Sequence, residues 1–261
     1  MTDFLDILAL DCKSNIERGY YRLDRADREL RHEKLSLKEN IIRCRKNAII
    51  AEIKRSSPSK GQIRGELNAA TIASEMERGG ASGISVLTEP KHFKGSLQDL
   101  MLVRESVAIP ILMKDFIVSR TQIDAASRIG ADAILLIMTI FERNYSDCGL
   151  EDMIKYAHFR DMEVLLEVNN EEEFRGAVGS GADLVGINNR DLKTLAVDIR
   201  TTERILKIFY NHNLTVVSES GIESQSDVRL LRGAGARGFL IGTSVMSTSN
   251  VEQKVRELVE A

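Results

Sequence analysis

The chain has 261 residues, a formal net charge of −3 and a hydrophobic fraction of 43%. This length allows one large core, and the balance of apolar and charged residues is typical of a soluble globular protein. The small negative charge gives no electrostatic reason to expect a nucleic-acid or anionic-membrane partner. No apolar stretch approaches the ~18 residues that a membrane helix needs. The acidic start M-T-D-F-L-D is unlike a signal peptide.

Cysteine and histidine are sparse and irregularly spaced. Cys12, Cys44 and Cys148 form no C-x-x-C pair, and an odd, scattered set predicts free thiols in a reducing cytoplasm. The four histidines show no H-E-x-x-H or Cys/His ligand spacing, so the sequence indicates no metal site and favours histidines on a solvated surface. No feature of the sequence indicates a particular protein partner.

The first part of the chain, residues 2–45, is strongly charged and helical in character. Phe4 and Leu8 suit the apolar face of a short amphipathic helix. Ser36 and Glu39 have the spacing of a capping box ahead of a second short helix. The apolar residues are too few for a separate core, so we expect a helical N-terminal extension over 1–45 and a single domain over 1–261.

From residue 47 onward, short apolar runs alternate with helical segments. The runs predict strands over 48–53, 83–87, 110–114, 133–137, 163–168, 184–187, 214–217 and 237–241. The segments between them predict helices over 69–78, 97–106, 119–129, 150–159, 170–178, 199–210, 224–231 and 250–259. Alternation of this kind predicts a parallel sheet with right-handed crossovers.

Eight such units over 46–261 predict a closed (β/α)8 TIM barrel, an α/β fold. A doubly wound open sheet is the alternative, but no G-x-G-x-x-G follows the first expected strand, which favours the barrel. Four Gly-Ala pairs support the same repeat, because each lies between a helix and the strand that follows it. Glycine ends the helix and a small residue lets the chain turn. We therefore assign these pairs a structural role at the N-terminal face of the barrel.

Charged and amide residues gather where the expected strands end. Active sites of (β/α)8 barrels lie at the C-terminal ends of the strands. The polar residues at those ends are Glu52, Lys54, Lys114, Glu167, Asn188 and Glu219. Taken singly, each fits a solvated loop charge. As a set, two lysines and three carboxylates at one mouth indicate acid–base chemistry without a metal ion.

The last two expected strands end in glycine and hydroxyl residues. S-E-S-G-I contains Gly221, and I-G-T-S contains Gly242 and Thr243. Barrels often bind phosphate at this place, through backbone N–H groups and a helix N-terminus. Ser57, in the loop after the first strand, would add a hydroxyl. Taken singly, Gly221 and Gly242 fit plain turn glycines equally well.

Eight segments occur in one order: E-I-K-R-S-S-P-S-K-G, I-S-V-L-T-E, L-M-K-D-F-I, A-D-A-I-L-L-I, L-L-E-V, G-I-N-N-R-D-L, S-E-S-G-I and F-L-I-G-T-S-V-M. Together they resemble indole-3-glycerol-phosphate synthase of tryptophan biosynthesis, over roughly residues 46–248. The resemblance implies a cofactor-free carboxy-lyase. Its substrate would be an anthranilate-derived sugar phosphate, 1-(2-carboxyphenylamino)-1-deoxyribulose 5-phosphate. The products would be indole-3-glycerol phosphate, carbon dioxide and water.

The resemblance also implies roles for the matched residues. Lys114 would be the general acid at the sugar carbonyl, and Lys54 would hold the substrate carboxylate and donate the proton for dehydration. Glu167 would stabilise the cationic intermediate, and Glu52 would position the lysines and act as base in the last step. The rest of the substrate would contact Asn188, Arg190, Glu219, Ser220, Phe93 and Phe116. The phosphate would contact Ser57, Gly221, Gly242 and Thr243.

The chain departs from the family pattern at three places outside these roles. Met113 precedes Lys114 where arginine is common, Asn169 replaces a frequent histidine, and Ala196 replaces a frequent glutamate. These departures bear on the surroundings of the site, including the pKa of Lys114.

Three other functions fit parts of the pattern. Phosphoribosylanthranilate isomerase, another phosphate-binding barrel, would need a Cys–Asp pair, and no cysteine ends the first strand. A non-catalytic barrel scaffold would have lost at least one of Glu52, Lys54, Lys114 or Glu167, and all four are present. A Schiff-base aldolase would also use a strand-end lysine, and borohydride trapping would distinguish it.

Overall fold

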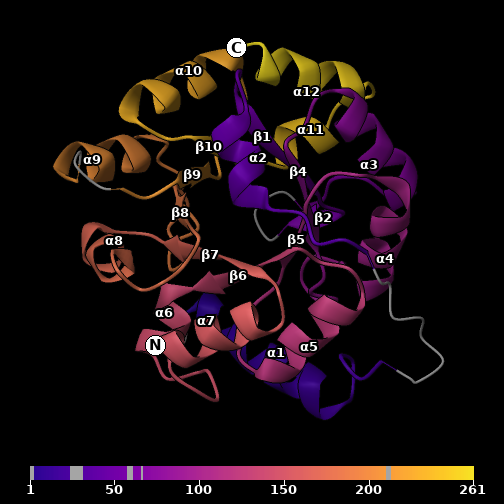
Figure 1. The fold of residues 1–261 in the computed structure, drawn as a ribbon, viewed down its shortest axis with the longest axis vertical. Helices are drawn as coiled ribbons and strands as arrows, with labels where there is room; N and C mark the ends of the chain where they lie inside the picture. The colour runs from indigo at the N-terminus through magenta and orange to yellow at the C-terminus, as the bar shows by residue number, and fades with distance from the viewer. Residues whose placement is uncertain (1–2, 24–31, 58–60, 66, 210–212) are drawn as a thin grey trace.

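The computed structural model describes residues 3–23, 32–57, 61–65, 67–209 and 213–261 (Figure 1). The strands of its closed parallel barrel are β1 (Ala48–Ile53), β4 (Gly83–Leu87), β5 (Ile111–Lys114), β6 (Ala133–Ile137), β7 (Glu163–Val168), β8 (Leu184–Asn188), β9 (Val216–Glu219) and β10 (Gly238–Ile241). They pair in the order β1-β10-β9-β8-β7-β6-β5-β4, and β1 closes the ring on β4. The predicted (β/α)8 barrel is confirmed.

Helices surround the ring of strands (Figure 1). They are α3 (Ala69–Arg78), α4 (Leu97–Ser106), α5 (Arg120–Arg128), α7 (Leu150–Phe159), α8 (Glu171–Ala177), α9 (Arg200–Ile208), α10 (Gln225–Ala234) and α12 (Val251–Val259). Several begin where the sequence predicts, because a polar side chain accepts a backbone N–H of the first turn. Ser119 does so for α5, Asn170 for α8 and Ser224 for α10.

Short elements and some boundaries differ from the prediction. The sequence analysis did not predict α6 (Met138–Glu142), α11 (Thr243–Met246) or the hairpin of β2 (Ser56–Ser57) and β3 (Gly61–Gln62). Helix α10 continues past its predicted end and stops at Gly235, whose φ of +113° is in the left-handed region that glycine tolerates. Strand β9 begins two residues later than predicted and includes Glu219.

Strand residues alternate between two cores. Side chains that point outward, such as Ile49, Ile111 and Val164, pack under the helices. Side chains that point inward, such as Ile50 and Leu112, form a second cluster inside the ring. Because side chains two apart share a face of a strand, the inward rows continue into the polar residues at the strand ends.

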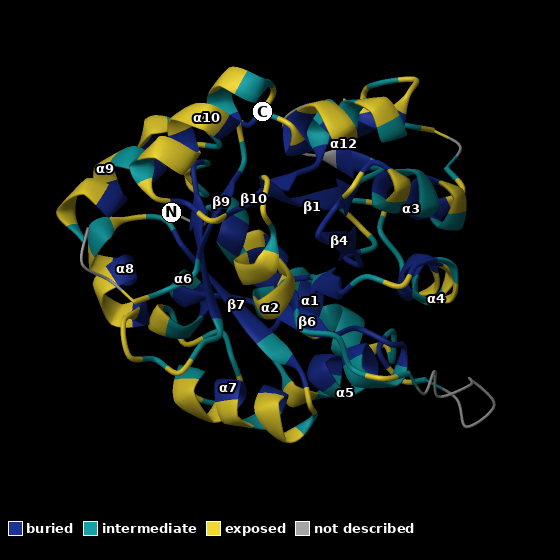
Figure 2. Cartoon of the chain, turned by 45° about the horizontal axis from the view of Figure 1, so that its top comes forward, coloured by how far each residue is buried: buried dark blue, intermediate teal, exposed yellow. Residues whose placement is uncertain are grey.

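The N-terminal extension contributes helices to both ends of the barrel. Helix α2 (Leu37–Arg43) lies at the N-terminal ends of the strands, which we call the floor, in the middle of the ring (Figure 2). A Cβ on Gly83, the first residue of β4, would lie 2.6 Å from Leu37. Helix α1 (Phe4–Glu17) buries Leu8 and Cys12 and lies at the opposite end, which we call the mouth.

The prediction of helical character fails for residues 18–23, of which 18–21 form turns and 22–23 have no regular structure, and residues 24–31 lie outside the described residues. Two histidines expected in solvent are instead partly buried and paired with carboxylates. His32 lies 2.8 Å from Asp132 and His92 lies 2.7 Å from Asp11. His212 falls outside the described residues. Within the described part of the chain, no helix has the length and apolar character needed to cross a membrane.

Candidate active site

The inward rows of the barrel change from apolar to polar at the mouth. Ile50 is followed two residues later by Glu52, Leu112 by Lys114 and Leu165 by Glu167. The same spacing places Asn188 and Glu219 at the ends of β8 and β9. The strand period therefore brings these predicted residues to one level of the barrel.

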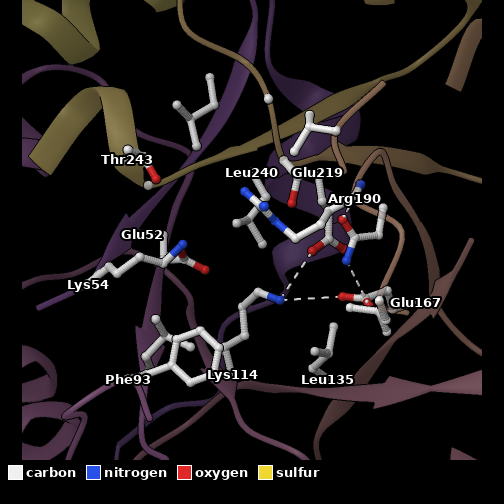
Figure 3. A pocket seen from close by; sticks show the side chains of 18 of the residues that line it. Glu52, Lys54, Phe93, Lys114, Leu135, Glu167, Arg190, Glu219, Leu240 and Thr243 are labelled. Atoms are coloured by element: carbon white, nitrogen blue, oxygen red, sulfur yellow. Dashed lines mark hydrogen bonds and ion pairs between the residues drawn. The ribbon is translucent and has the colours of Figure 1, made fainter. Parts of the chain in front are cut away.

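A cavity of about 380 Å³ opens at this level (Figure 3). Thirteen of the fourteen predicted site residues line it: Glu52, Lys54, Phe93, Lys114, Phe116, Glu167, Asn188, Arg190, Glu219, Ser220, Gly221, Gly242 and Thr243. The other, Ser57, lies in β2, and its side chain is not among those that the structure describes.

Lys114 lies between two buried carboxylates. Its ammonium is 3.4 Å from Glu167 Oε2 and 3.4 Å from Glu219 Oε2 (Figure 3). Asn188 donates a hydrogen bond of 3.0 Å to the other oxygen of Glu167. Burial alone would lower the pKa of Lys114, but Glu219, Glu167 and Glu52 together raise it above its ordinary value. Lys114 is therefore protonated at neutral pH.

Lys54 and Glu52, at the end of β1, form a second charged pair at the mouth. The Lys54 ammonium lies 2.5 Å from Glu52 Oε1, and the Glu52 side chain is almost fully buried. The carboxylate of Glu52 also occupies the space beside Gly242, the residue that follows β10, because a Cβ on Gly242 would lie 2.4 Å from Oε1. Gly242 thus makes room for Glu52, a role that the sequence analysis did not assign to it.

Glu219 is the least satisfied carboxylate at the mouth. The residue is 1% exposed, and neither oxygen forms a hydrogen bond with any described residue, so the long ion pair to Lys114 is its main polar contact. Burial, opposed by Lys114 and reinforced by Glu167 and Glu52, raises the pKa of Glu219 to about 7. Gly186 leaves the space for this carboxylate, since a Cβ there would lie 2.1 Å from Oε1.

Arg190 reaches the cavity from the loop after β8. Its guanidinium donates a hydrogen bond of 2.9 Å to the carbonyl of Leu195. Burial lowers the pKa of this guanidinium below its ordinary value, and the negative charge of Glu52 opposes part of that shift. Asn169 fixes the backbone of this loop, because its Nδ2 donates to the carbonyls of Asn188, at 3.2 Å, and Arg190, at 2.8 Å. Asn169, one of the three departures from the family pattern, therefore fixes the loop that carries Arg190, a predicted substrate contact.

One side of the cavity is apolar and aromatic. The rings of Phe93 and Phe116 lie with their centroids 5.8 Å apart and their planes tilted by 31°. Leu135 and Leu240 also line the cavity, from inside the barrel. A planar aromatic ring fits such a wall.

The loops after β9 and β10 form another part of the lining. Ser220 and Gly221 both have positive φ, +68° and +79°, so the chain turns sharply after Glu219. Positive φ at a non-glycine residue such as Ser220 is uncommon, and such strain is often found at functional sites. Gly242 precedes α11 and Thr243 is its first residue, so backbone N–H groups of this short helix begin at the cavity.

Sequence reasoning missed several lining residues. Phe4 and Leu8 of α1 line the cavity, and so does Asp115, a buried residue that accepts hydrogen bonds from Tyr21 and Thr88. The sequence marked Phe4 and Leu8 as an apolar helix face, but nothing near them in the chain indicates which end of the barrel they meet. Among the described residues, no group of three or more His, Cys, Asp or Glu side chains could hold a metal ion.

Solved structures share the fold at low sequence identity. A thiamine phosphate pyrophosphorylase from Pyrococcus furiosus matches with a TM-score of 0.61 at 18% identity, over 85% of this chain and 96% of that one. An N-acetylmannosamine-6-phosphate 2-epimerase from Clostridium perfringens matches with a TM-score of 0.59 at 15% identity, over 82% and 92%. These similarities concern the barrel architecture alone.

Sequence comparisons are more specific. The family model described as indole-3-glycerol phosphate synthase matches residues 11–258. A relative of that name from Methanocaldococcus jannaschii is 46% identical over 232 residues, which cover 87% of this chain and 84% of the relative. Another of that name from Aquifex aeolicus is 44% identical over 212 residues, covering 81% and 80%. The chain belongs to the indole-3-glycerol phosphate synthase family.

Proposed function

We propose that this chain closes the indole ring of indole-3-glycerol phosphate from 1-(2-carboxyphenylamino)-1-deoxyribulose 5-phosphate. The observation that supports the assignment of roles is the position of Lys114, held between two carboxylates in a cavity with an aromatic wall and two glycine-containing strand-end loops. The substrate has matching parts: an aromatic ring, a carboxylate, a ketone and a phosphate.

Lys114 acts as the general acid in the first step. The ring carbon that bears the carboxylate attacks the sugar carbonyl carbon, and Lys114 donates a proton to the carbonyl oxygen as the C–C bond forms. The developing alkoxide is more basic than an amine, so the raised pKa of Lys114 does not prevent the transfer. Glu167 and Glu219 hold the ammonium in place at 3.4 Å.

Lys54 binds the substrate carboxylate and Glu52 holds Lys54. The nucleophilic attack leaves positive charge on the anilino nitrogen, and loss of carbon dioxide returns the bonding electrons to the ring. Glu167 stabilises that positive charge before decarboxylation. Lys54 then protonates the hydroxyl group, which leaves as water. Glu52 removes a proton from the new ring, and this loss forms the double bond of the indole.

The phosphate and the ring occupy different parts of the cavity. Backbone N–H groups at Gly221, Gly242 and Thr243 bind the phosphate, as helix N-termini and glycine turns commonly do. Phe93 and Phe116 contact the aromatic ring. With both ends of the substrate fixed, the ring carbon is directed to the carbonyl at Lys114.

The test is a continuous assay of indole fluorescence with this substrate and purified protein. We expect signal from the wild type and a loss of kcat of about 10²- to 10⁴-fold in Lys114→Ala. Lys155→Ala, which removes an exposed lysine from α7, is the matched control and should keep its rate.

The outcomes separate the function from the residue roles. No signal from well-folded wild type would contradict ring closure and favour the isomerase or the scaffold. Equal rates in the wild type and Lys114→Ala would keep the function and move the general acid to Lys54. Trapping of the protein by borohydride with a keto sugar phosphate would instead support a Schiff-base aldolase.

We also propose that the protein works in the cytoplasm. Cys12, Cys44 and Cys148 are free thiols, which suits a reducing compartment. Detection of the protein in an oxidising compartment after cell fractionation would contradict this placement.

A further inference from the structure

Helix α1 is attached to two loops at the mouth by charged contacts. Near its start, Arg143 lies 2.8 Å from Asp3 and 2.5 Å from Asp6. Arg143 directly follows α6, in the segment after β6. In the next turns of α1, Asp11 contacts two residues of the loop after β4. The helix therefore spans from one strand-end loop to another.

The Asp11 contacts form what we call the clasp: Asp11 with Lys91 at 2.8 Å and with His92 at 2.7 Å. The ring of Phe4 meets the His92 ring edge to face, with 5.5 Å between centroids. Lys91 is 60% exposed, whereas Asp11 and His92 are about four-fifths buried. The His92 contact is thus the sheltered part of the clasp, and the exposed Lys91 ion pair is the part that salt screens.

The loop after β4, which Asp11 of α1 contacts, is itself fixed by a buried residue. Glu89 is 0% exposed, and its carboxylate accepts the backbone N–H groups of Lys91, His92 and Phe93 at 2.8, 2.7 and 3.0 Å. The carbonyl of Glu89 accepts the N–H of Gly95 at 2.9 Å, which closes the turn. The loop is therefore a preorganised partner, and the clasp fixes α1 relative to it.

The clasp residue shares a helix face with cavity residues. Phe4, Leu8 and Asp11 follow the spacing of four and three residues that places side chains on one face of a helix. Phe4 and Leu8 line the cavity, and so does Phe93, the residue after His92. The Asp11 contacts therefore connect the apolar face of α1 to the loop that carries Phe93, and both line the same cavity.

We propose that Asp11 is a positioning residue for ring closure: by binding Lys91 and His92 it holds Phe4 and Leu8 against the aromatic wall and so sets the affinity for the substrate ring. Asp11 does not touch the reacting atoms, so its loss acts on binding. Partly exposed ion pairs are weak, which allows α1 to release when the product leaves. The choice of substrate rests on the proposed function, but the clasp does not.

The experiment compares Asp11→Ala with the wild type in two measurements. Alanine favours helix more than aspartate does, so α1 itself should remain helical. We expect faster amide hydrogen exchange in α1 and a KM about three- to fivefold higher, with kcat within twofold, because fewer molecules hold the binding-competent arrangement. Asp11→Glu, which keeps the charge, should recover most of the affinity.

Glu17→Ala is the matched control, because it removes an exposed carboxylate from the last turn of the same helix. It should leave both measurements unchanged. Equal exchange in α1 and equal KM in Asp11→Ala and the wild type would overturn the proposal. A fall in kcat without a change in KM would also overturn it, since Asp11 would then act on the chemistry. Absence of turnover in the wild type would contradict the proposed function, while the exchange result would still test the clasp.

Discussion

The floor and the mouth of the barrel each contain a carboxylate residue that is 1% exposed, and the two differ in their hydrogen bonds. At the floor, Asp132 accepts from Arg104 at 3.0 Å and from the backbone N–H groups of Leu35, at 3.0 Å, and Ile111, at 2.9 Å. At the mouth, Glu219 forms no hydrogen bond with any described residue. Burial alone therefore does not distinguish a structural carboxylate from a functional one.

The difference lies in what each carboxylate stabilises. Asp132 joins the extension, α4 and the start of β5, so its hydrogen bonds hold several elements together. Glu219 faces a cavity and Lys114, and its unmet hydrogen-bonding capacity is available to a substrate. An unsatisfied buried carboxylate costs stability. The fold tolerates that cost at the mouth, where the site needs the group.

The largest effect on stability should come from the floor. Asp132→Ala leaves the buried guanidinium of Arg104 without its carboxylate, and loss of one partner of a buried pair costs ~3–5 kcal/mol. We expect the free energy of unfolding to fall by about that amount in urea titrations, while kcat and KM of the remaining folded enzyme stay within twofold. A large loss of kcat in folded Asp132→Ala would break the distinction between floor and mouth.

The opposite pattern is expected for Gly186→Ala. The added Cβ would lie 2.1 Å from Glu219 Oε1, so the carboxylate must leave its place beside Lys114. We expect kcat to fall by about 10²-fold, comparable to the loss of one preorganised electrostatic group, with a smaller change in melting temperature. Gly233→Ala is the control, because a Cβ there would meet nothing within 4 Å. Full activity in Gly186→Ala would show that the position of Glu219 is not critical.

These two variants test features that the sequence predicts unequally. The barrel strands could be predicted, because each is an apolar run bounded by turn residues, and the period of two then identifies Glu52, Lys114 and Glu167 as one inward-facing set. The space that Gly186 and Gly242 leave for carboxylates on neighbouring strands could not. It depends on contacts between residues far apart in the chain, which no local pattern records.

The short elements were missed for a related reason. Helices α6 and α11 have five and four residues, too few for a helical repeat to appear in the sequence. Helix α1 was predicted, but its place at the mouth depends on Asp11 meeting the loop after β4, some eighty residues later in the chain. The family resemblance supplied the residue roles, and the physical pattern supplied their common level in the barrel.

A smaller effect, of opposite sign on stability, is expected for Glu219→Gln. Burial raises the pKa of Glu219 to about 7 in the folded protein, above its ordinary value. The folded state then binds more protons than the unfolded state between about pH 4.5 and 7, so this group's contribution to stability is lost as pH rises through that range. Glutamine does not titrate, so the variant should be more stable than the wild type at pH 8, by on the order of 1–3 kcal/mol.

Thermal unfolding at pH 5 and pH 8 checks this expectation. The difference between variant and wild type should be small at pH 5 and should favour the variant at pH 8, even though kcat falls. Taking the difference removes the contributions of all other titrating groups. A variant that is less stable than the wild type at pH 8 would mean that the ion pair with Lys114 outweighs the burial of the charge.

The smallest effect is expected at Asn169, whose side chain is partly hydrogen-bonded and so lies between the cases of Asp132 and Glu219. Both protons of its Nδ2 are used, on the carbonyls of Asn188 and Arg190, whereas its Oδ1 is buried without a partner among the described residues. Asn169→Ala frees the loop that carries Arg190, and the loss of two neutral hydrogen bonds should lower kcat/KM by about three- to tenfold. Glu172→Ala, an exposed change nearby on α8, is the control. If Asn169→Ala lowered the free energy of unfolding by several kcal/mol and left kcat/KM unchanged, Asn169 would be a structural residue like Asp132. Residues that serve the site rather than the fold would then be found only closer to Lys114.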